Sequence, residues 1–440
     1  MKILLVCYSY FPELSPRAFR WTAIAEELVR LDHQVVVICG GSTSRADFEC
    51  VNGVEIHRTG SNARELVKRW FNLGFKVDPT HPSTIIRARV SIKGWLGKLV
   101  KSAYNHTLSK IIWPDFAALW YFSALKKAIA LQKNRSTDVL VTVSLPYSGH
   151  LIGYSLKRRF EMRWVVDIGD PFSFMTETPV NNTALFRGLN AKSESSVLAL
   201  ADMVTVTTKE TRFEYLKYFP NLEQTKIVVV PPLFSPPKSV DCLTYSSADS
   251  NKIRLVFAGT LYKSIRNPGT LLRFFQNLLA TSLAEQLELH FYGVMNDCHQ
   301  CFNEYVDLID SKVFIHGLVP REQAVRAMQN ATVLVNIGNA TDYQLPSKVV
   351  EYVMMGKPVL NVTKLYLDSS QSFFSNYGGV CNVAERDLIN DSTEFERVKH
   401  FVENPPAIDT KYIEQLSRTH STQSVTQNYL ALFKDGNSKL

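Results

Sequence analysis

The stretch Tyr343-Gln-Leu-Pro-Ser-Lys-Val-Val-Glu-Tyr-Val-Met-Met-Gly-Lys-Pro-Val359 predicts a short helix followed directly by a buried strand. Ser347 is a natural N-cap for this helix, and Pro346 before it marks the start. Gly356 and Pro358 end the helix, so both of its boundaries are well marked. A short helix leading into an apolar strand is the repeating element of a doubly wound α/β domain.

Two charged side chains near the start of this helix carry a functional signal. Lys348 and Glu351 are three residues apart and therefore lie on one face. An ammonium at a helix N-terminus suits a phosphate, and a carboxylate one turn deeper suits sugar hydroxyls, which predicts nucleotide-sugar binding. The same spacing also fits a surface ion pair that contributes a few tenths of a kcal/mol. The local pattern alone leaves both interpretations open.

Short apolar runs alternate with helical patterns along the rest of the chain. Near-continuous apolar strands without polar alternation indicate parallel sheets that are covered on both faces. Several strands of the second half end in Gly, which lets the backbone approach a ligand at the carboxyl edge of a sheet. The predicted strands span 2–8, 33–39, 138–144, 163–168, 203–208 and 226–231 in the first half, and 253–259, 287–293, 313–317, 332–337 and 358–362 in the second.

The 440 residues, of which 45% are hydrophobic and 20% charged, are too many for one ordinary core. Four prolines between positions 231 and 237, followed by Ser, Asp and Asn, indicate a linker. The predicted fold is α/β, with two facing doubly wound Rossmann-like domains. The predicted parts are an N-terminal domain (1–235), a linker (236–252), a C-terminal domain (253–410) and a terminal helical segment (411–440).

The composition limits which binding partners and which cellular compartment are expected for this protein. The formal net charge of +8 favours anionic partners such as nucleotides or lipid phosphates. Because the chain has no zinc-finger spacing and no aromatic RNA-binding signature, no nucleic acid is expected. Seven scattered cysteines are typical of reduced thiols in an intracellular protein. The lone Cys298-His-Gln-Cys301 has no second pair at metal-site spacing, so a metal or redox role is the less favoured interpretation.

The N-terminus and one internal segment bear on localisation. The short apolar run at residues 2–8 predicts a first strand rather than a signal peptide. No stretch reaches the roughly 18 apolar residues of a membrane-spanning helix, which predicts a cytoplasmic protein. Between 85 and 134, an apolar stripe from Ile92 to Ala103 is flanked by lysines. It fits a helix packed on the sheet, or an interfacial helix on an anionic membrane surface at the inner face of the cell membrane.

Several motifs together resemble the GT-B glycosyltransferases of the group-1 or family-four type, in a bacterial surface-polysaccharide subgroup. The likeness runs along nearly the whole chain and implies two Rossmann-like domains with the nucleotide sugar on the second. In similar proteins a C-terminal helix crosses back to the first domain, which is expected here for 411–434. The motifs are Phe11 to Arg20, His33 to Val37, Pro114-Asp115 with Trp120, Ser144 to His150, Asp167 to Phe172, and Pro346 to Pro358.

On the donor side, the resemblance implies that Glu351 holds the ribose hydroxyls of a UDP- or GDP-linked sugar. The family's partner acid falls at Tyr343, so backbone amides from Leu345 through Ser347 to Lys348 are expected to contact the sugar and phosphates instead. Arg266 and Lys348 are expected to neutralise the leaving diphosphate, without a metal or other cofactor. Gly259, Thr260 (where the family often has Arg) and Lys263 complete the predicted donor site. Lys263 and Arg266 also agree with a second interpretation, in which they are solvent-exposed cations of a loop and have no role in binding.

On the acceptor side, the resemblance implies catalytic roles for His150 and Asp170. A neutral imidazole at His150 could contact the donor sugar or assist proton transfer. A second interpretation is that each residue is structural, either as a helix cap or as a buried group with satisfied hydrogen bonds. Ser15, Arg17 and Arg20 are expected to approach the diphosphate, and Arg17 also suits the phosphate of a lipid-linked acceptor.

These features predict a glycosyltransferase that moves a sugar from a nucleotide diphosphate sugar to a glycan or lipid-linked acceptor in cell-surface glycan synthesis. The resemblance implies retention of the anomeric configuration. Two alternatives stay open at this stage. One is a sugar-nucleotide epimerase on the same fold. The other is a catalytically degenerate subunit that binds nucleotide sugar, for which Tyr343 and Thr260 are the support.

Overall fold

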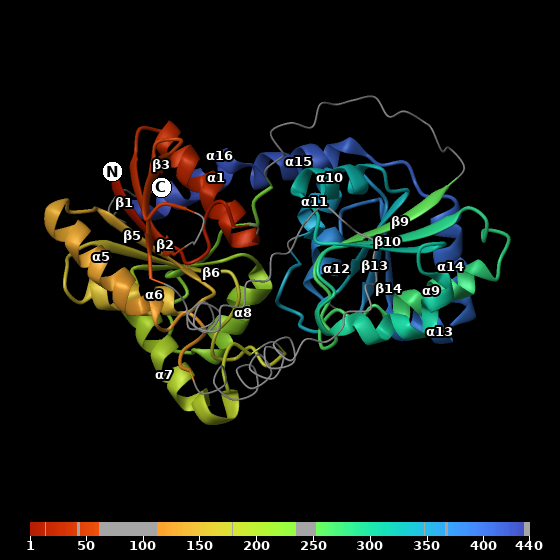
Figure 1. Cartoon of the computed structure of the whole chain (residues 1–440), viewed down its shortest axis with the longest axis horizontal. Helices are drawn as coiled ribbons and strands as arrows, with labels where there is room; N and C mark the ends of the chain where they lie inside the picture. The colour runs from red at the N-terminus through yellow and green to blue at the C-terminus, as the bar shows by residue number, and fades with distance from the viewer. Residues whose placement is uncertain are drawn as a thin grey trace, which may run out of the picture. The chain divides into compact units, whose positions relative to one another are not determined.

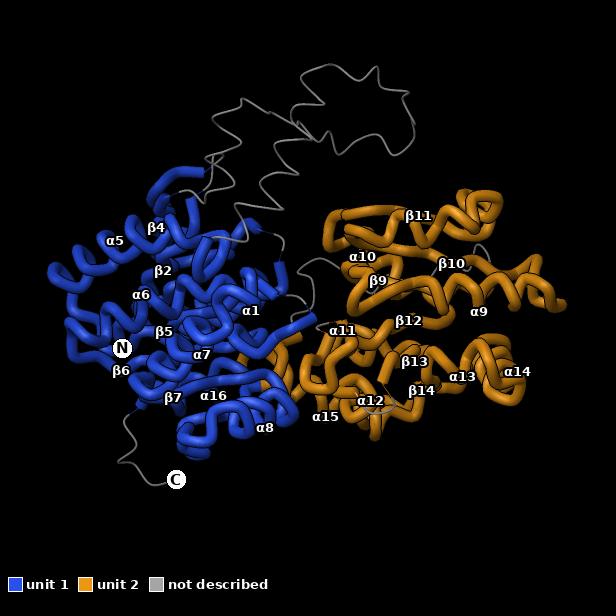
Figure 2. The backbone as a smooth tube through the Cα atoms, turned by 90° about the horizontal axis from the view of Figure 1, so that it is seen from below, with its two compact units in different colours: residues 1–230, 425–440 blue, residues 231–424 orange. Residues whose placement is uncertain are grey.

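The computed structural model describes residues 1–13, 15–41, 45–60, 112–177, 179–234, 252–346, 348–365 and 368–434. It divides into two compact units, residues 1–230 with 425–440 and residues 231–424 (Figure 2). The apolar stripe from Ile92 to Ala103 and the linker at 236–252, except its last residue, lie outside the described residues. In the described part of the chain, no helix is long and apolar enough to cross a membrane.

The first unit is built on an eight-stranded sheet in the order β3-β4-β2-β1-β5-β6-β7-β8 (Figure 1). All neighbouring strands pair in parallel except β3 and β4. Its strands are β1 (Lys2–Val6), β2 (Gln34–Gly40), β3 (Phe48–Val51), β4 (Val54–Thr59), β5 (Val139–Ser144), β6 (Arg163–Ile168), β7 (Met203–Val206) and β8 (Ile227–Val229). Its helices are α1 (Pro16–Arg30), α5 (Trp120–Asn134), α6 (Ser148–Lys157), α7 (Thr183–Leu200), α8 (Lys209–Tyr218) and α16 (Thr422–Phe433).

The hairpin of β3 and β4 was missed in the sequence, although a signal for it is present. Asn52 and Gly53 join the two strands, with φ of 49° and 80°. Two consecutive residues with positive φ form the tight turn that suits the twist of a hairpin, and Asn-Gly is the dipeptide that adopts it most readily. The antiparallel pair therefore adds an edge strand to an otherwise parallel sheet.

The second unit has a six-stranded sheet in the order β11-β10-β9-β12-β13-β14, parallel throughout. Its strands are β9 (Ile253–Ala258), β10 (Leu287–Tyr292), β11 (Val313–Gly317), β12 (Val333–Ile337), β13 (Val359–Thr363) and β14 (Val380–Ala384). Its helical segments are α9 (Gly269–Leu279), η2 (Asn296–Leu308), α10 (Arg321–Gln329), α11 (Lys348–Met354), α12 (Ser369–Phe374), α13 (Glu385–Asn390), α14 (Ser392–Glu403) and α15 (Thr410–His420). The predicted α/β class with doubly wound sheets is confirmed.

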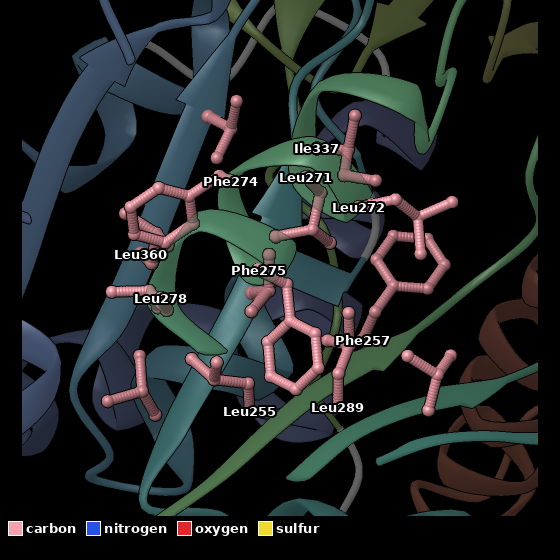
Figure 3. Close-up of a cluster of buried hydrophobic side chains, with 14 of the residues drawn as sticks. Leu255, Phe257, Leu271, Leu272, Phe274, Phe275, Leu278, Leu289, Ile337 and Leu360 are labelled. Carbon is pink, nitrogen blue, oxygen red and sulfur yellow. The ribbon is translucent and has the colours of Figure 1, made fainter. Parts of the chain in front are cut away.

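Helices cover both faces of this second sheet, which explains why its strands are almost entirely apolar. On one face, α9 buries Leu271, Phe274, Phe275 and Leu278 against the strands, and Figure 3 shows these side chains clustered over the sheet. On the other face, α10, α11 and α12 bury residues such as Met328, Val349, Val353 and Phe374.

The C-terminal segment forms two helices, where the sequence analysis treated 411–434 as one. Ser421 separates α15 from α16 in an extended conformation, with φ −65° and ψ 155°. Its Oγ accepts a hydrogen bond from the Ser424 amide at 3.1 Å, which caps the start of α16. From Val425 onward the chain belongs to the first unit.

A buried carboxylate attaches α16 to the first unit. Asp167 at the end of β6 accepts hydrogen bonds from Trp21 Nε1 at 2.8 Å, Thr205 Oγ1 at 2.7 Å and Tyr429 OH at 2.6 Å. Arg20 donates to the same Tyr429 hydroxyl at 3.1 Å. One charge thus joins β6, β7, α1 and α16, and charge-assisted bonds of this kind are the stronger class.

Replacing Tyr429 with Phe removes a hydroxyl that both donates to Asp167 and accepts from Arg20. Because this leaves buried groups without that partner, we expect the free energy of unfolding of the first unit to fall by about 1–3 kcal/mol. Urea denaturation followed by tryptophan fluorescence measures it. Tyr218→Phe, at an exposed ring, is the matched control and should be neutral. Equal stability of the two variants would contradict this role of Tyr429.

Candidate functional site

The strand order of the second sheet reverses between β9 and β12, and ligands of doubly wound folds bind beside the carboxyl ends of the strands at such a point. Two side chains from the loops that follow these strands meet there. Arg266 Nε donates to Asn339 Oδ1 at 2.8 Å, and Asn339 Nδ2 donates to the Gln344 carbonyl at 2.8 Å. The structure thus brings the predicted Arg266 to this edge, together with Asn339, which sequence analysis missed.

A tight turn positions Arg266. The Arg266 amide donates to the Tyr262 carbonyl at 2.8 Å, and the two residues form an isolated bridge. The chain therefore doubles back after β9, and Arg266 Nη1 lies 3.4 Å from the Thr260 carbonyl oxygen. Lys263 lies in this turn with an exposed side chain. Of the predicted loop cations, Arg266 is thus held against the strand ends and Lys263 extends into solvent.

Two glycines allow the ends of β9 and β10 to approach each other. A Cβ at Gly293 would lie 1.9 Å from the Gly259 carbonyl oxygen, and φ of Gly293 is 125°, a value that L side chains rarely adopt. The Gly259 amide donates to the Tyr292 carbonyl at 2.8 Å. Gly293 is therefore required for this contact between the two strand ends, and the approach of Gly259 to a ligand stays a prediction.

At the start of α11, Glu351 accepts from two cations. Lys348 Nζ lies 2.7 Å from one carboxylate oxygen, and Arg321 Nη1, from the first residue of α10, lies 3.1 Å from the other. The Glu351 side chain is 14% exposed, so this pair differs from the surface pair considered above. Each carboxylate oxygen keeps acceptor capacity for a further hydroxyl. No sequence pattern points to Arg321, because it is far from Glu351 along the chain.

The protonation state of Glu351 follows from these contacts. Burial alone would raise the pKa of the carboxyl group. The positive charges and hydrogen bonds of Lys348 and Arg321 outweigh it, and the pKa of Glu351 is lowered. Glu351 is therefore an ionised acceptor at neutral pH.

Tyr352 fixes α11 against the end of β9. Its hydroxyl accepts from the Ala258 amide at 2.9 Å and donates to the Ala258 carbonyl at 3.2 Å. Tyr343, at the position of the family's partner acid, has a buried side chain, and Leu345 is half-buried. Ser347 lies outside the described residues. The one hydroxyl of Tyr352 thus sets the distance between the predicted helix and the strand that carries Gly259.

In the first unit, Arg17 and Asp170 meet at the carboxyl edge of β5 and β6. Arg17 donates through Nη2 to Asp170 Oδ2 and through Nε to the Ser144 carbonyl. Ser15 Oγ caps α1 by accepting from the Ala18 amide at 3.2 Å, which places Arg17 in the first turn of the helix. The structure therefore pairs two residues that the sequence analysis gave separate roles.

His150 is a buried neutral imidazole. Trp164 Nε1 donates to Thr142 Oγ1 at 2.9 Å, and Thr142 Oγ1 lies 2.8 Å from His150 Nδ1. If the Thr142 hydroxyl donates to Nδ1, the ring proton lies on Nε2. Among the described residues Nε2 has no hydrogen-bond partner, and burial lowers the pKa of His150 to about 3. At neutral pH the ring is therefore uncharged.

Arg20 faces a structural partner. Its guanidinium donates to the Val230 carbonyl at 3.3 Å and to Tyr429 OH, and lies 5.7 Å from the centroid of the Tyr429 ring. These contacts hold α16. Its expected approach to a diphosphate stays a prediction.

In the Cys-His-Gln-Cys motif, burial raises the pKa of Cys298 to about 12, so this thiol is protonated. Among the described residues, no group of three metal-ligating side chains comes together.

Solved structures with the same architecture cover nearly the whole chain. Sucrose-phosphate synthase from Thermosynechococcus elongatus covers 98% of both chains with a TM-score of 0.66 and 13% identity. A glycosyltransferase from Rickettsia africae covers 99% of both chains with a TM-score of 0.57 and 12% identity. The lipopolysaccharide outer core galactosyltransferase WaaB covers 98% of this chain and 99% of its own, with a TM-score of 0.54 and 11% identity.

The chain has the GT-B fold. At these identities the likeness establishes the fold alone, and no family model or curated protein matches the sequence. A putative UDP-N-acetylglucosamine 2-epimerase from Listeria monocytogenes is also similar, with a TM-score of 0.50 and 10% identity over 98% of this chain and 95% of its own. The GT-B fold is thus shared by structures described as transferases and by one described as an epimerase.

Within the GT-B fold, each unit carries a cation held by polar partners at the carboxyl edge of its sheet. The first has Arg17 on Asp170, and the second has Arg266 on Asn339. Fixed cations of this kind suit the binding of anionic groups, because their side chains lose little further freedom when a ligand arrives.

The lowered pKa of Glu351 predicts a pH-dependent contribution to stability. At neutral pH, Glu351→Gln should reduce the free energy of unfolding of the second unit by about 1–2 kcal/mol, because two cations lose a charged partner. Since the folded-state pKa lies below the unfolded value of about 4.3, this contribution is complete above about pH 5 and is lost as the pH falls through the folded-state pKa. The difference between variant and parent should therefore close in acid.

Chemical denaturation at a series of pH values between about 3 and 7 measures this difference. Glu396→Gln is the matched control, since Glu396 forms a Lys–Glu pair at the same spacing with a side chain that is 64% exposed. It should have little effect at any pH. A Glu351→Gln difference that is independent of pH would contradict the assigned ionisation.

Proposed function

We propose that this protein is a glycosyltransferase that takes a sugar from a UDP- or GDP-linked donor. Two observations support the proposal: Arg266 is held by Asn339 at the switch point of the second sheet, and Lys348 and Arg321 hold Glu351 on α11, which Tyr352 joins to the end of β9. Arginine and lysine side chains suit the oxygens of a diphosphate, and the ionised Glu351 suits the ribose hydroxyls as an acceptor.

In the proposed mechanism, the second unit stabilises the leaving group. As the glycosidic bond to the diphosphate breaks, negative charge grows on the phosphate oxygens, and Arg266 and Lys348 neutralise it without a metal ion. Arg266 is already held by Asn339, so little reorganisation is needed when the charge develops. Gly259, Thr260 and Leu345 contribute backbone groups, and Lys263 is a weaker candidate because it is exposed.

His150, Arg17 and Asp170 have proposed roles on the acceptor side. With the ring proton on Nε2, the uncharged His150 ring would donate a hydrogen bond to a hydroxyl of the donor sugar. Asp170 is paired with Arg17, which makes it a poor covalent nucleophile and favours front-face transfer with retention. A lipid-linked or polysaccharide intermediate in cell-surface glycan synthesis is the proposed acceptor, with Arg17 meeting a lipid-linked phosphate.

The likeness to an epimerase supports one alternative, the epimerisation of a nucleotide sugar on the same donor site. The two activities leave different products. A transferase releases the nucleoside diphosphate and, without acceptor, slowly hydrolyses the donor, while an epimerase inverts one sugar carbon and keeps the glycosidic bond. A degenerate subunit would bind the donor and leave it intact. Proton NMR of the donor sugar after incubation distinguishes these three outcomes.

Removing Arg266 tests the donor site directly. Arg266→Ala should reduce donor hydrolysis or transfer by roughly a hundredfold or more, because one group that stabilises transition-state charge is lost. Among UDP, GDP, CMP and their sugars, the cognate ligand at 100 times its Kd should stabilise the parent protein by about 2.7 kcal/mol, and the variant by much less at the same concentration. Thermal unfolding with each ligand measures the shift, and product release measures the rate.

Arg273→Ala is the control for Arg266, because Arg273 is an exposed arginine on α9 of the same unit. It should bind and react like the parent. If no nucleotide shifts the melting temperature of the parent, the proposed function fails. If Arg266→Ala keeps full turnover, the assignment of Arg266 fails and the function stands.

An anionic membrane surface is the proposed partner that brings the enzyme to a lipid-linked acceptor at the inner face of the cell membrane. The net charge of +8 supports it. Co-sedimentation with vesicles containing about 30% anionic lipid should exceed that with neutral vesicles and should weaken with salt, as electrostatic attraction does. Equal recovery on both kinds of vesicle would contradict this proposal.

A further inference from the structure

Two neighbouring strands of the first sheet place polar side chains against His150. Leu140 on β5 pairs with Trp164 on β6, and Thr142 lies two residues after Leu140, so Thr142 and Trp164 are on the same face of the sheet. Gly153 lets α6 approach this face closely. A Cβ at Gly153 would lie 2.6 Å from Thr142 Cγ2 and 2.7 Å from the Trp164 ring. The three side chains are therefore packed together in the core of the first unit.

The direction of each hydrogen bond in this cluster follows from the chemistry of its groups. Thr142 is fully buried, and in the described part of the chain its Oγ1 has two partners, Trp164 Nε1 at 2.9 Å and His150 Nδ1 at 2.8 Å. An indole Nε1 only donates, so the Thr142 hydroxyl accepts from Trp164 and its own hydrogen needs another acceptor. Buried hydroxyls are rarely left without one, and His150 Nδ1 is the acceptor within reach. Nδ1 therefore carries no hydrogen, and the proton of the uncharged ring lies on Nε2.

The start of α6, which carries His150, is fixed by other contacts. Asp115 accepts from the Ser148 amide at 2.9 Å and from Ser148 Oγ at 2.8 Å. The Tyr147 ring meets the His150 ring edge to face, with 5.7 Å between the centroids. These four residues are all buried. The backbone and the ring plane of His150 are thus held by groups other than Thr142, which leaves to Thr142 the position of the ring proton.

His150 Nε2 is the open end of this chain of hydrogen bonds. The atom is buried and has no partner among the described residues, whereas buried polar atoms are normally bonded. Two charged groups act on the ring, the Asp167 carboxylate, which favours its protonation, and the Arg17 guanidinium, which opposes it. Burial is the larger effect and lowers the pKa to about 3. At neutral pH the ring can therefore offer a hydrogen bond from Nε2 and cannot accept a proton there.

We propose that Trp164 and Thr142 are positioning residues that hold His150 as a hydrogen-bond donor, with Nδ1 occupied and the proton on Nε2. The ligand group that such a donor recognises is an acceptor oxygen, such as that of a sugar hydroxyl. The effect on turnover rests on the proposed function, because it assumes that this hydroxyl belongs to the donor sugar. The position of the proton does not depend on that function and is measurable in the protein without a ligand.

Long-range proton–nitrogen correlation NMR of the full chain, with isotope-labelled histidine, locates the ring proton. His150→Gln identifies the signals of this residue among the ten histidines. We expect an unprotonated Nδ1 and a protonated Nε2, both unchanged between about pH 5 and about pH 8, because the ring titrates well below this range. A protonated Nδ1 in the parent protein overturns the proposal.

A pair of substitutions at Thr142 tests the positioning role. Thr142→Val removes the hydroxyl and keeps the shape of the side chain, so Nδ1 loses its hydrogen bond and its nitrogen resonance should shift. Thr142→Ser keeps the hydroxyl and should keep the resonance of the parent. If Nδ1 has the same resonance in Thr142→Val as in the parent, Thr142 does not hold the ring and the proposal is wrong. If circular dichroism shows that Thr142→Val does not fold, Thr142→Ala replaces it under the same criterion.

Turnover separates this inference from the proposed function. With a donor sugar that the parent hydrolyses, kcat should fall about five- to tenfold in Thr142→Val and stay near the parent value in Thr142→Ser, as expected for the loss of one oriented hydrogen bond. Equal kcat in the two variants overturns the role of this hydrogen bond in turnover. If the parent hydrolyses no donor, the proposed function fails, and the NMR criterion for Thr142 still decides the proposal.

Discussion

The parallel pairing of β9 with β12 is the constraint on which the second unit depends. Leu255 faces Val333 and Val256 faces Leu334, so both strands end at the same edge. Because the strand order reverses at this pair, the loops that follow them diverge to opposite faces of the sheet and leave the edge between them accessible to a ligand. The contact between Arg266 and Asn339 and the position of α11 against Ala258 both depend on this register.

The electrostatic design is similar in the two units. In each, an arginine near the carboxyl edge is held by a side chain from another element, Asp170 for Arg17 and Asn339 for Arg266. The two partners differ in charge, because Asp170 is a carboxylate and Asn339 is a neutral amide. Glu351 with Lys348 and Arg321 adds an ionised carboxylate beside that charge. Removing charged groups from water costs free energy, and this desolvation cost is offset only where the groups form good hydrogen bonds. Glu351 forms such bonds with both Lys348 and Arg321.

The elements of the fold were largely predictable because apolar runs mark buried parallel strands. The strand at 163–168 coincides with β6, and the five strands predicted in the second half are β9 to β13. The prediction missed β3, β4 and β14, which lie at or next to a sheet edge and whose short apolar runs are interrupted by polar residues such as Glu49, Glu55 and Asn382. It also treated the C-terminal segment as one helix, since the break at Ser421 depends on a capping bond rather than on a helix-breaking residue.

The sequence by itself determined the α/β class, the positions of most strands, and the residue types of the candidate site, because hydrophobic periodicity and helix boundaries are local properties. Only the tertiary structure decided which of those residues meet. It paired Arg17 with Asp170, assigned Arg20 to α16, and brought Arg321 and Asn339 to residues far away in the chain. The physical reason is that these contacts depend on strand order and on the direction in which each side chain leaves its element, and no local pattern carries that information.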